Sequence, residues 1–449
     1  MKDQVQHLRE RGILADAIYA DKSRNEILQT LDNCIFGGVK ILYVSPERLA
    51  SELFHTKLKH INVSFITVDE AHCISQWGYD FRPSYLQIAK IREMIPQVPI
   101  LALTATATPE VVDDIQERLH FAEKNVFKMS FERKNLAYVV RNTSNKQGEM
   151  VHILQSVKGS AIVYARSRKR TKEMAELLSK KGISATFYHA GLAPDEKDVR
   201  QKAWQADEVR VMCATNAFGM GIDKPDVRYV IHYDIPKSLE GYYQETGRAG
   251  RDGGEGQCIA FYAYKDLQKL EKFMQGKPVA EQEIGKQLLL ETAAYAETSV
   301  CRRKVLLHYF GEEYLEDNCG NCDNCLNPKK QVEAKELLSA VLEVISTLKE
   351  KFKADYIVNI LVGNETSEIQ NYKHNELEVF GSGQDEDDKT WNAVIRQALI
   401  AGYLAKDIEN YGLLKITEKG KEFMKKPVSF KITEDNEFEE EEEEVPVRG

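Results

Sequence analysis

The chain has 449 residues, of which 43% are hydrophobic, and a formal net charge of −9. This length is enough for about three domains that each bury a core. No apolar run reaches the ~18 residues of a membrane-spanning helix, and the charged start MKDQVQHLRERG differs from a signal peptide. We therefore expect a cytoplasmic protein without a membrane partner, in which thiols stay reduced.

Acidic residues dominate only the C-terminal end. From Glu434 onward the chain carries nine acids and one Arg, and the remainder carries 61 acids against 60 bases. A surface that binds nucleic acid must then be a local basic patch, because the chain as a whole provides no positive field.

Strand and helix patterns alternate through the first half of the chain. The expected elements are helix 2–11, strand 17–19, helix 25–34, strand 41–44, strand 65–68, helix 83–94, strand 100–104, helix 111–119, strand 161–164, helix 168–181, strand 186–189, helix 194–204, strand 209–214 and strand 229–233. This order is typical of α/β proteins with doubly wound parallel sheets. It predicts two such lobes in succession.

The first candidate site lies at the end of the strand 65–68. The apolar run stops at Asp69-Glu70-Ala71-His72, so two carboxylates are expected at the C-terminal edge of a sheet, where α/β proteins bind ligands. In a nucleotide hydrolase the first acid holds Mg²⁺ and the second polarises the attacking water. We assign Asp69 to the metal and Glu70 to the water, and expect His72 to link them to neighbouring groups. The alternative is a strand end with two solvated acids.

An aromatic-rich loop follows directly. Trp77, Tyr79, Phe81 and Tyr85 lie within nine residues, together with Arg82. Aromatic rings in a loop stack nucleic-acid bases, at roughly 1–3 kcal/mol for each base. The alternative, four rings in a core, is less favoured because the segment has no helix or strand period. The pattern indicates a nucleotide site adjoining a strand-binding loop.

This stretch resembles motif II and the aromatic loop of RecQ-family DNA helicases, and the resemblance extends from residue 1 to about residue 430. Tyr79 stands where relatives usually carry His. By this resemblance, residues 1–5 correspond to the end of motif Ia, and Thr104–Pro109 corresponds to motif III. The 449 residues contain no motif 0 and no phosphate-binding sequence G-x-x-x-x-G-K-[ST]. We therefore expect an incomplete first RecA-like lobe, poor ATP binding and negligible hydrolysis by these residues alone.

Two further motifs of the family are matched in the second lobe. The segment 215–223 resembles motif V, in which Thr215 is a candidate contact to the DNA backbone, Gly219 permits close approach of a ligand, and Asp223 accepts from a ribose hydroxyl. The segment 244–251 resembles motif VI. The resemblance implies a catalytic role for Gln244, a γ-phosphate or motif II contact for Arg248 and an arginine finger at Arg251. The alternative for these arginines is a basic surface turn.

Four cysteines indicate a metal site. Cys301, Cys319, Cys322 and Cys325 follow the spacing C-x17-C-x2-C-x2-C, which suits tetrahedral structural zinc. The adjacent Arg302 and Arg303 are candidate contacts to DNA phosphates, with ordinary solvated charge as the alternative.

Residues 331 to about 430 resemble the winged helix of the family. Helices are expected at 337–351, 356–361 and 390–399, followed by a hairpin of strands 402–408 and 413–417. Tyr411, at the hairpin tip, is a candidate for stacking on a terminal base pair.

The expected domains are a partial RecA-like lobe at 1–122, a second lobe at 123–265, a helical zinc module at 266–330, a winged helix at 331–433 and a disordered acidic tail or linker at 434–449. The resemblance implies an ATP-dependent 3′–5′ DNA helicase that needs Mg²⁺ and serves DNA repair, recombination and replication. Its implied partners are single-stranded and duplex or branched DNA and a single-strand-binding protein, and we expect a monomer. Two alternatives remain open: a non-catalytic module that binds DNA forks or junctions, and an RNA helicase.

Overall fold

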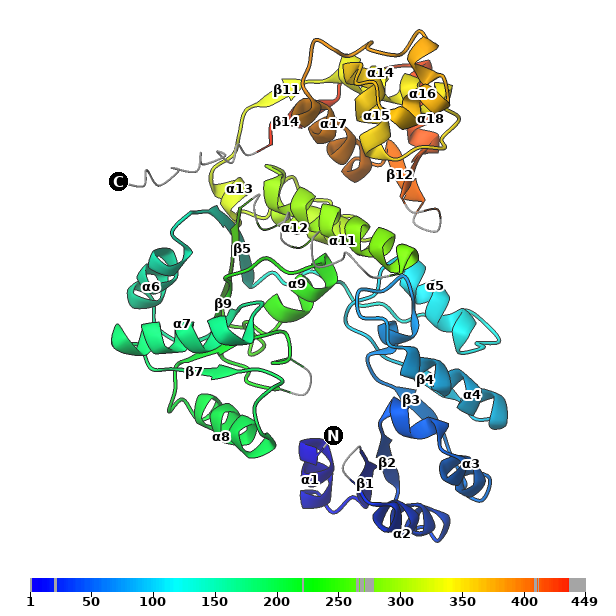
Figure 1. Cartoon of the computed structure of the whole chain (residues 1–449), viewed down its shortest axis with the longest axis vertical. Helices are drawn as coiled ribbons and strands as arrows, with labels where there is room; N and C mark the ends of the chain where they lie inside the picture. The colour runs from blue at the N-terminus through cyan, green and yellow to red at the C-terminus, as the bar shows by residue number, and fades with distance from the viewer. Residues whose placement is uncertain are drawn as a thin grey trace, which may run out of the picture. The chain divides into compact units, whose positions relative to one another are not determined.

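The computed structural model describes residues 2–19, 22–219, 222–263, 266, 270, 278–407, 410 and 412–435. The chain forms two compact units, residues 1–129 and residues 130–449 (Figure 1). No helix in the described part of the chain combines the length and apolar character needed to cross a membrane.

Unit 1 is built from short parallel strands and flanking helices. Its elements are α1 (Lys2–Glu10), β1 (Ala15–Ile18), α2 (Arg24–Ile35), β2 (Ile41–Val44), α3 (Glu52–Leu58), β3 (Ile66–Val68), α4 (Leu86–Met94), β4 (Ile100–Ala102) and α5 (Pro109–Arg118). Strand β1 pairs in parallel with β2, and β3 pairs in parallel with β4. This parallel pairing places the residues after β3 and β4 at the same edge, so segments that follow the two strands can meet there.

The C-terminal half of unit 1 has its own core beneath that edge. Val68 of β3 and Ala71 and Ile74 of the following turn are buried together with Val111 and Ile115 of α5. Helix α5 therefore packs against the turn that carries the candidate acids and holds it on the body of the unit.

Unit 2 begins with a parallel sheet of six strands in the order β5-β10-β9-β6-β8-β7. The strands are β5 (Leu136–Asn142), β6 (Ser160–Tyr164), β7 (Ala185–Tyr188), β8 (Val211–Ala214), β9 (Val227–His232) and β10 (Gly256–Tyr262). Helices α6 (Lys146–Ser156) and α7 (Arg168–Lys180) supply one core of apolar side chains, and α8 (Pro194–Gln205) and α9 (Leu239–Thr246) contribute to the other. The parallel α/β fold predicted from the alternating pattern is confirmed.

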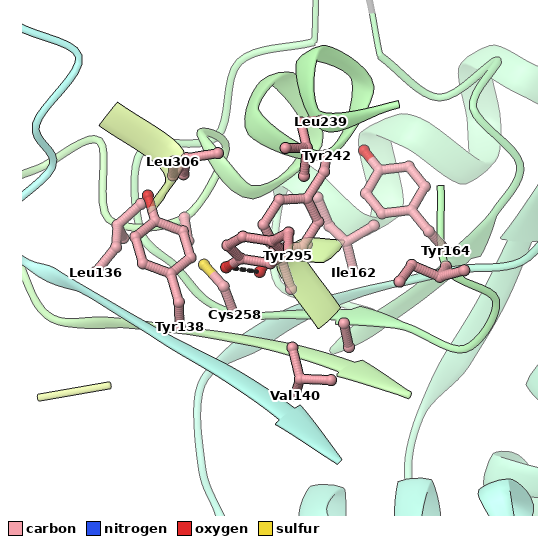
Figure 2. Close-up of a cluster of buried hydrophobic side chains, with 14 of the residues drawn as sticks. Leu136, Tyr138, Val140, Ile162, Tyr164, Leu239, Tyr242, Cys258, Tyr295 and Leu306 are labelled. Atoms are coloured by element: carbon pink, nitrogen blue, oxygen red, sulfur yellow. Dashed lines mark hydrogen bonds between the residues drawn. The ribbon is translucent and has the colours of Figure 1, made fainter. Parts of the chain in front are cut away.

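An aromatic cluster joins this sheet to the helices that follow it (Figure 2). Tyr138 of β5, Tyr242 of α9 and Tyr295 of α11 (Val279–Glu297) are almost completely buried in one core. The Tyr295 hydroxyl lies 3.2 Å from the Tyr242 hydroxyl, so two buried polar groups satisfy each other. Three segments distant in the sequence thus share one core, which supports α9 and the motif VI residues at its end.

The cysteine-rich segment and a small helical domain complete unit 2. Helices α12 (Arg302–Tyr309) and α13 (Asp323–Leu326) flank the cysteine loop. The last domain contains β11 (Gln331–Glu333), α14 (Lys335–Thr347), α15 (Ala354–Val362), α16 (Ser367–Asn371), α17 (Asp388–Ile400), β12 (Leu404–Asp407), β13 (Leu413–Ile416), α18 (Glu418–Lys425) and β14 (Lys431–Thr433). Strands β12 and β13 pair antiparallel, which confirms the predicted hairpin, and β11 pairs antiparallel with β14.

Candidate functional site

The turn after β3 presents the two candidate acids in different ways. Asp69 is exposed, and its Oδ1 accepts a hydrogen bond of 2.9 Å from the Glu70 amide. Glu70 has φ 50°, in the left-handed region that residues other than glycine rarely adopt. Such backbone strain is concentrated at functional sites, and it is a signal that the sequence alone does not provide. Glu70, the residue with this strained backbone, is also the residue predicted to polarise the attacking water.

His72 is the centre of the contacts around this turn. It is buried, and its Nδ1 lies 2.9 Å from Thr104 Oγ1, a residue just beyond β4. The same nitrogen lies 3.5 Å from Glu70 Oε2. The imidazole ring also stacks on Tyr79, with ring centroids 5.1 Å apart. One side chain therefore contacts the acidic turn, the motif III segment and the aromatic loop.

Burial determines the charge of this histidine. Removal from water lowers the pKa of His72 to about 4, and the nearby charges of Asp80, Arg82 and Asp69 act as smaller influences. His72 is therefore neutral at pH 7 and can use its two ring nitrogens as one donor and one acceptor.

The aromatic loop is held in shape by an internal ion pair. Two nitrogens of Arg82 donate to Asp80 Oδ2, at 3.1 and 2.6 Å, and the Arg82 amide donates to the Cys73 carbonyl. Trp77, Tyr79 and Phe81 are half-buried, so part of each ring faces solvent. Tyr85 differs from the expectation for the four rings: it is buried, and its hydroxyl donates to the Asp69 carbonyl at 3.3 Å. Tyr85 is therefore not among the rings that partly face solvent, and His72 covers one face of Tyr79.

In unit 2, the segments 215–223 and 244–251 come together at one edge of the sheet. Arg251 Nη1 lies 3.3 Å from Asp223 Oδ1, and both side chains are exposed. Arg248 is buried and donates to the Ile222 carbonyl at 3.3 Å. A Cβ atom on Gly219 would lie 3.1 Å from Arg248 Nη2, which explains why glycine suits this position. The predicted cofactor residues thus lie beside the predicted arginines.

The remaining residues assigned to this edge lie close by in the fold. Thr215 is buried at the end of β8, and its amide donates to the Tyr188 carbonyl of β7. Gln244 is half-buried on α9. A phosphate contact for Thr215 and a catalytic role for Gln244 stay predictions.

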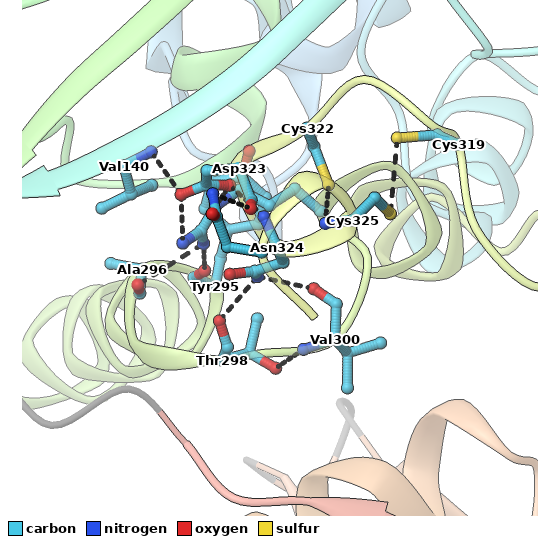
Figure 3. A network of polar contacts seen from close by, with 12 residues as sticks. Val140, Tyr295, Ala296, Thr298, Val300, Cys319, Cys322, Asp323, Asn324 and Cys325 are labelled. Carbon is cyan, nitrogen blue, oxygen red and sulfur yellow. Dashed lines mark hydrogen bonds and ion pairs between the residues drawn. The ribbon is translucent and has the colours of Figure 1, made fainter. Parts of the chain in front are cut away.

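Four cysteines form the candidate metal centre, and Figure 3 labels three of them, Cys319, Cys322 and Cys325. Their sulfur atoms all lie within 4.8 Å of one another, and the sulfurs of Cys319 and Cys325 are 3.8 Å apart. A tetrahedral Zn²⁺ with Zn–S bonds of ~2.3 Å requires sulfurs ~3.8 Å apart. Hydrogen bonding among the thiols raises the pKa of Cys301 to about 11 and lowers the pKa of Cys319, so they cannot all ionise without a cation. The donor set fits structural zinc.

The two arginines beside Cys301 correct an expectation. Arg302 and Arg303 are 1% and 4% exposed, so neither guanidinium group reaches solvent. Arg302 forms a two-pronged ion pair with Asp323, at 2.6 and 3.0 Å, while Arg303 donates to backbone carbonyls. The prediction that they contact DNA phosphates is wrong for this arrangement, because both guanidinium groups are buried against partners inside the protein. Tyr411, predicted to stack on a base pair, lies outside the described residues.

Two residues that hold the motif VI turn carry no motif in the sequence. Arg133 and Asn135 precede β5, and their side chains donate to backbone carbonyls between residues 247 and 254. Their partners are more than a hundred positions away in the sequence, so no local pattern indicates these contacts.

Comparison with known proteins places these sites in a family context. Four family models match in sequence: DEAD/DEAH box helicase at residues 1–115, helicase conserved C-terminal domain at 145–253, RecQ zinc-binding at 264–326 and RQC domain at 328–441. The predicted zinc module and winged helix thus coincide with domains that these models describe. The unit boundary after Met129 lies slightly later than the expected lobe boundary at residue 122.

Individual relatives agree with this order of domains. The chain is 39% identical over 428 residues to the ATP-dependent DNA helicase RecQ of Pasteurella multocida, covering 95% of this chain and 68% of the relative. The chain is also 39% identical to the protein of the same name from Haemophilus influenzae, covering 95% of this chain and 69% of that relative. A mimivirus protein named putative ATP-dependent RNA helicase R290 is 35% identical, with 94% of this chain and 80% of the relative covered. The chain, with its helicase domains, zinc-binding cysteines and RQC domain, belongs to the RecQ family of ATP-dependent DNA helicases.

Proposed function

We propose that this chain is the motor and DNA-binding part of a 3′–5′ DNA helicase that separates duplex or branched DNA. Asp69 binds Mg²⁺ with ATP, and Glu70 orients the attacking water. Arg248 and Arg251 stabilise the charge that develops on the transferred phosphoryl group. The 3′–5′ direction is taken from the family.

The contacts of His72 are the observation that carries this proposal. The ring lies within 3.5 Å of the Glu70 carboxylate and stacks on Tyr79 in the aromatic loop. If nucleotide binding or hydrolysis shifts the acidic turn, the His72 ring moves with it, and this ring packs against Tyr79 of the proposed DNA-binding loop. Nucleotide state is thereby transmitted to the strand through packed and hydrogen-bonded side chains.

Tryptophan fluorescence tests the aromatic loop directly. The chain has three Trp residues, and Trp204 and Trp391 are each 1% exposed, so Trp77 is the one placed to report stacking. We expect single-stranded oligothymidylate to quench the emission, and Trp77→Phe to abolish the change. Thr104→Val removes the hydroxyl partner of His72 and should alter the amplitude of quenching. Unchanged emission at saturating DNA would exclude this loop as a stacking surface.

We further propose that these 449 residues by themselves bind ATP poorly. They include no Gly-rich loop with Lys, whose amides and ammonium group cradle the β- and γ-phosphates. Their own activity would then be the alternative function, binding of forks or junctions through the zinc module and winged helix. Filter binding and strand separation, each with and without Mg²⁺-ATP, distinguish the two. DNA-stimulated ATP hydrolysis by the pure chain would overturn the low-activity proposal.

The finer assignments of substrate and setting are proposals as well. We propose DNA rather than RNA as the substrate, a monomeric state, a cytoplasmic location, and a single-strand-binding protein as a partner. Competition between DNA and RNA forks of identical sequence tests the substrate, and sedimentation with and without DNA tests the monomer. We keep the domain division at residues 122, 265, 330 and 433 as a proposal that limited proteolysis can test.

A further inference from the structure

We propose that the zinc module positions the motif VI arginines, through Arg303 and then Arg133. The chemical consequence rests on the function proposed above for Arg248 and Arg251. The mechanical connection stands on contacts within unit 2 alone. It has three successive layers, which run from the motif VI turn back to the cysteine loop.

The first layer holds the motif VI backbone. Arg133 donates from Nη1 to the Gly247 carbonyl at 3.1 Å and from Nη2 to the Ala249 carbonyl at 2.9 Å and the Gly250 carbonyl at 3.2 Å. Asn135 Nδ2 donates to the carbonyls of Gly250, at 2.8 Å, and Gly254, at 2.7 Å. Two side chains thus fix the peptide groups on both sides of Arg248 and just before Arg251.

The turn itself leaves little room to adapt. Gly250 has φ 55°, and a Cβ atom there would lie 2.4 Å from the Gly254 carbonyl oxygen and 2.5 Å from Asn135 Nδ2. This close packing forces the carbonyls toward Arg133 and Asn135. The Gly250 carbonyl also accepts from the Gly253 amide, and the Gly247 carbonyl from Arg251 Nε, at 3.1 and 3.4 Å. Loss of Arg133 would leave the buried Ala249 carbonyl without its side-chain donor, which favours a different turn conformation.

The second layer holds Arg133 in place. Arg303 of α12 donates from Nη2 to the carbonyls of Arg133, Lys134 and Leu136, at 3.3, 3.3 and 2.9 Å. Its Nη1 lies 3.5 Å from Glu132 Oε1. A guanidinium group that is 4% exposed is therefore the anchor for the backbone that carries Arg133 and Asn135.

The third layer connects α12 with the cysteine loop. Cys301 is the N-cap of α12, and Asp323 follows Cys322 directly. The Asp323 carboxylate forms an ion pair with Arg302. It also accepts a hydrogen bond of 3.0 Å from the Val140 amide of β5 (Figure 3). Zinc held by the four thiols would fix Cys301 at the start of α12 and Cys322 next to Asp323. A well-ordered cysteine loop thereby holds β5, the strand that directly follows Arg133 and Asn135.

Hydrogen exchange of the complete chain tests this inference without any need for ATP. The turn amides suit the measurement because Gly247, Gly250 and Asp252 each donate a backbone hydrogen bond. The variants are Arg303→Lys and Arg133→Lys, which keep the charge and lose the planar fork of donors. Asn135→Ala removes the two other donors to the turn. A fourth sample is the wild-type chain after zinc removal by a chelator.

Arg210→Lys is the matched control. Arg210 is half-buried like Arg133, and it donates to three carbonyls in the same lobe, those of Leu154, Val157 and Gly159, at 2.7, 2.7 and 2.8 Å. None of these belongs to the motif VI turn. Arg210→Lys therefore removes a similar set of hydrogen bonds, but around residues 154–159 instead of the motif VI turn.

We expect exchange in residues 247–254 to become roughly fivefold to tenfold faster in both arginine variants and in Asn135→Ala, as the loss of one or two net hydrogen bonds implies. Chelation should accelerate residues 247–254 as well as 301–326. Arg210→Lys should accelerate residues 154–160 and leave the turn unchanged. The proposal is overturned if Arg303→Lys or chelation leaves the turn at its wild-type rate, or if Arg210→Lys accelerates it equally. Failure of ATP coupling would leave these exchange rates unaffected, so the two proposals fail separately.

Discussion

The imidazole ring of His72 stacks on the phenol ring of Tyr79, with 13° between the ring planes and 5.1 Å between the centroids. His72 belongs to the turn that carries the two acids, and Tyr79 to the loop proposed to bind DNA. A contact of this kind is worth about 0.5–1.5 kcal/mol beyond burial, enough to make the two segments move together. It is the contact on which the proposed coupling between nucleotide state and the DNA-binding loop rests.

The buried His72 predicts that unit 1 loses stability in mild acid. Its pKa is lowered to about 4 in the folded state by burial, against the ordinary value of 6.5. Between these values the unfolded chain binds a proton that the folded chain does not, so the free energy of unfolding falls as pH falls from 6.5 toward 4. The loss amounts to about 1.4 kcal/mol at one pH unit below 6.5.

Hydrogen exchange of residues 66–107 in urea, at pH 7.5 and 5.5, measures this loss. His72→Gln should remove most of the pH dependence, and substitution of the exposed His60 by Gln should leave it intact. Equal pH dependence in wild type and His72→Gln would show that His72 is not the titrating group.

A buried glutamate predicts the opposite trend in unit 2. Glu240 of α9 is 2% exposed, and burial raises the pKa of its carboxyl group to about 7, against 4.5 ordinarily. The folded chain holds a proton between these values that the unfolded chain releases, so stability contributed here is present below 4.5 and declines as pH rises through 7. Glu240→Gln should raise the melting temperature most at pH 8, by somewhat more than half as much at pH 6, and little below pH 4.5. Glu173→Gln on the exposed face of α7 is the control, and equal melting shifts for both variants would contradict the prediction.

The cysteine cluster predicts about one zinc ion per chain. Cys325→Ser removes one of four ligands and should release the metal and increase exchange in residues 301–326, because zinc affinity contributes directly to folding. Cys34→Ser lies outside the cluster and should retain the ion. Metal analysis by mass spectrometry measures the zinc content, and a zinc-free wild-type chain with unchanged stability would contradict the assignment.

Burial of Arg302 predicts a loss of stability rather than of DNA affinity. Arg302→Ala removes the charged partner of Asp323, whose side chain is 21% exposed and keeps the Val140 amide as a donor. The cost should therefore lie at or below the ~3–5 kcal/mol of breaking a fully buried ion pair. Urea unfolding measures the cost, with the neighbouring half-buried Lys304→Ala as control. The slope of DNA affinity against salt concentration should match the wild type. A slope smaller by about one, with normal stability, would instead identify Arg302 as a phosphate contact.

The sequence predicted the sites whose chemistry depends on neighbours along the chain. The apolar run that ends in Asp69 and Glu70 indicated a strand edge, and the cysteine spacing indicated the metal centre. Both depend on local order, which patterns of residue type record well. The same patterns predicted β2 at residues 41–44, in agreement with the structure.

The parts that the sequence did not reveal depend on partners far along the chain. Arg302 and Arg303 stand in a basic run, which is usually solvated, and only the folded chain brings Asp323 and the carbonyls of residues 133–136 to them. Strands β5 and β10 were missed because neither carries a motif, although β10 is a buried apolar run. The left-handed φ of Glu70 likewise has no sequence signature.

The proposed binding of DNA and the proposed need for a phosphate-binding loop are tested most directly with the 449-residue chain and a 3′-tailed fork that carries a dye and a quencher across its duplex. Anisotropy of the dye reports binding, and release of the quencher reports strand separation. We predict salt-dependent binding of the fork that Mg²⁺-ATP leaves unchanged, without strand separation by these 449 residues. Absence of fork binding at low salt would contradict the assignment of DNA as substrate, and ATP-driven separation would contradict the requirement for a phosphate-binding loop.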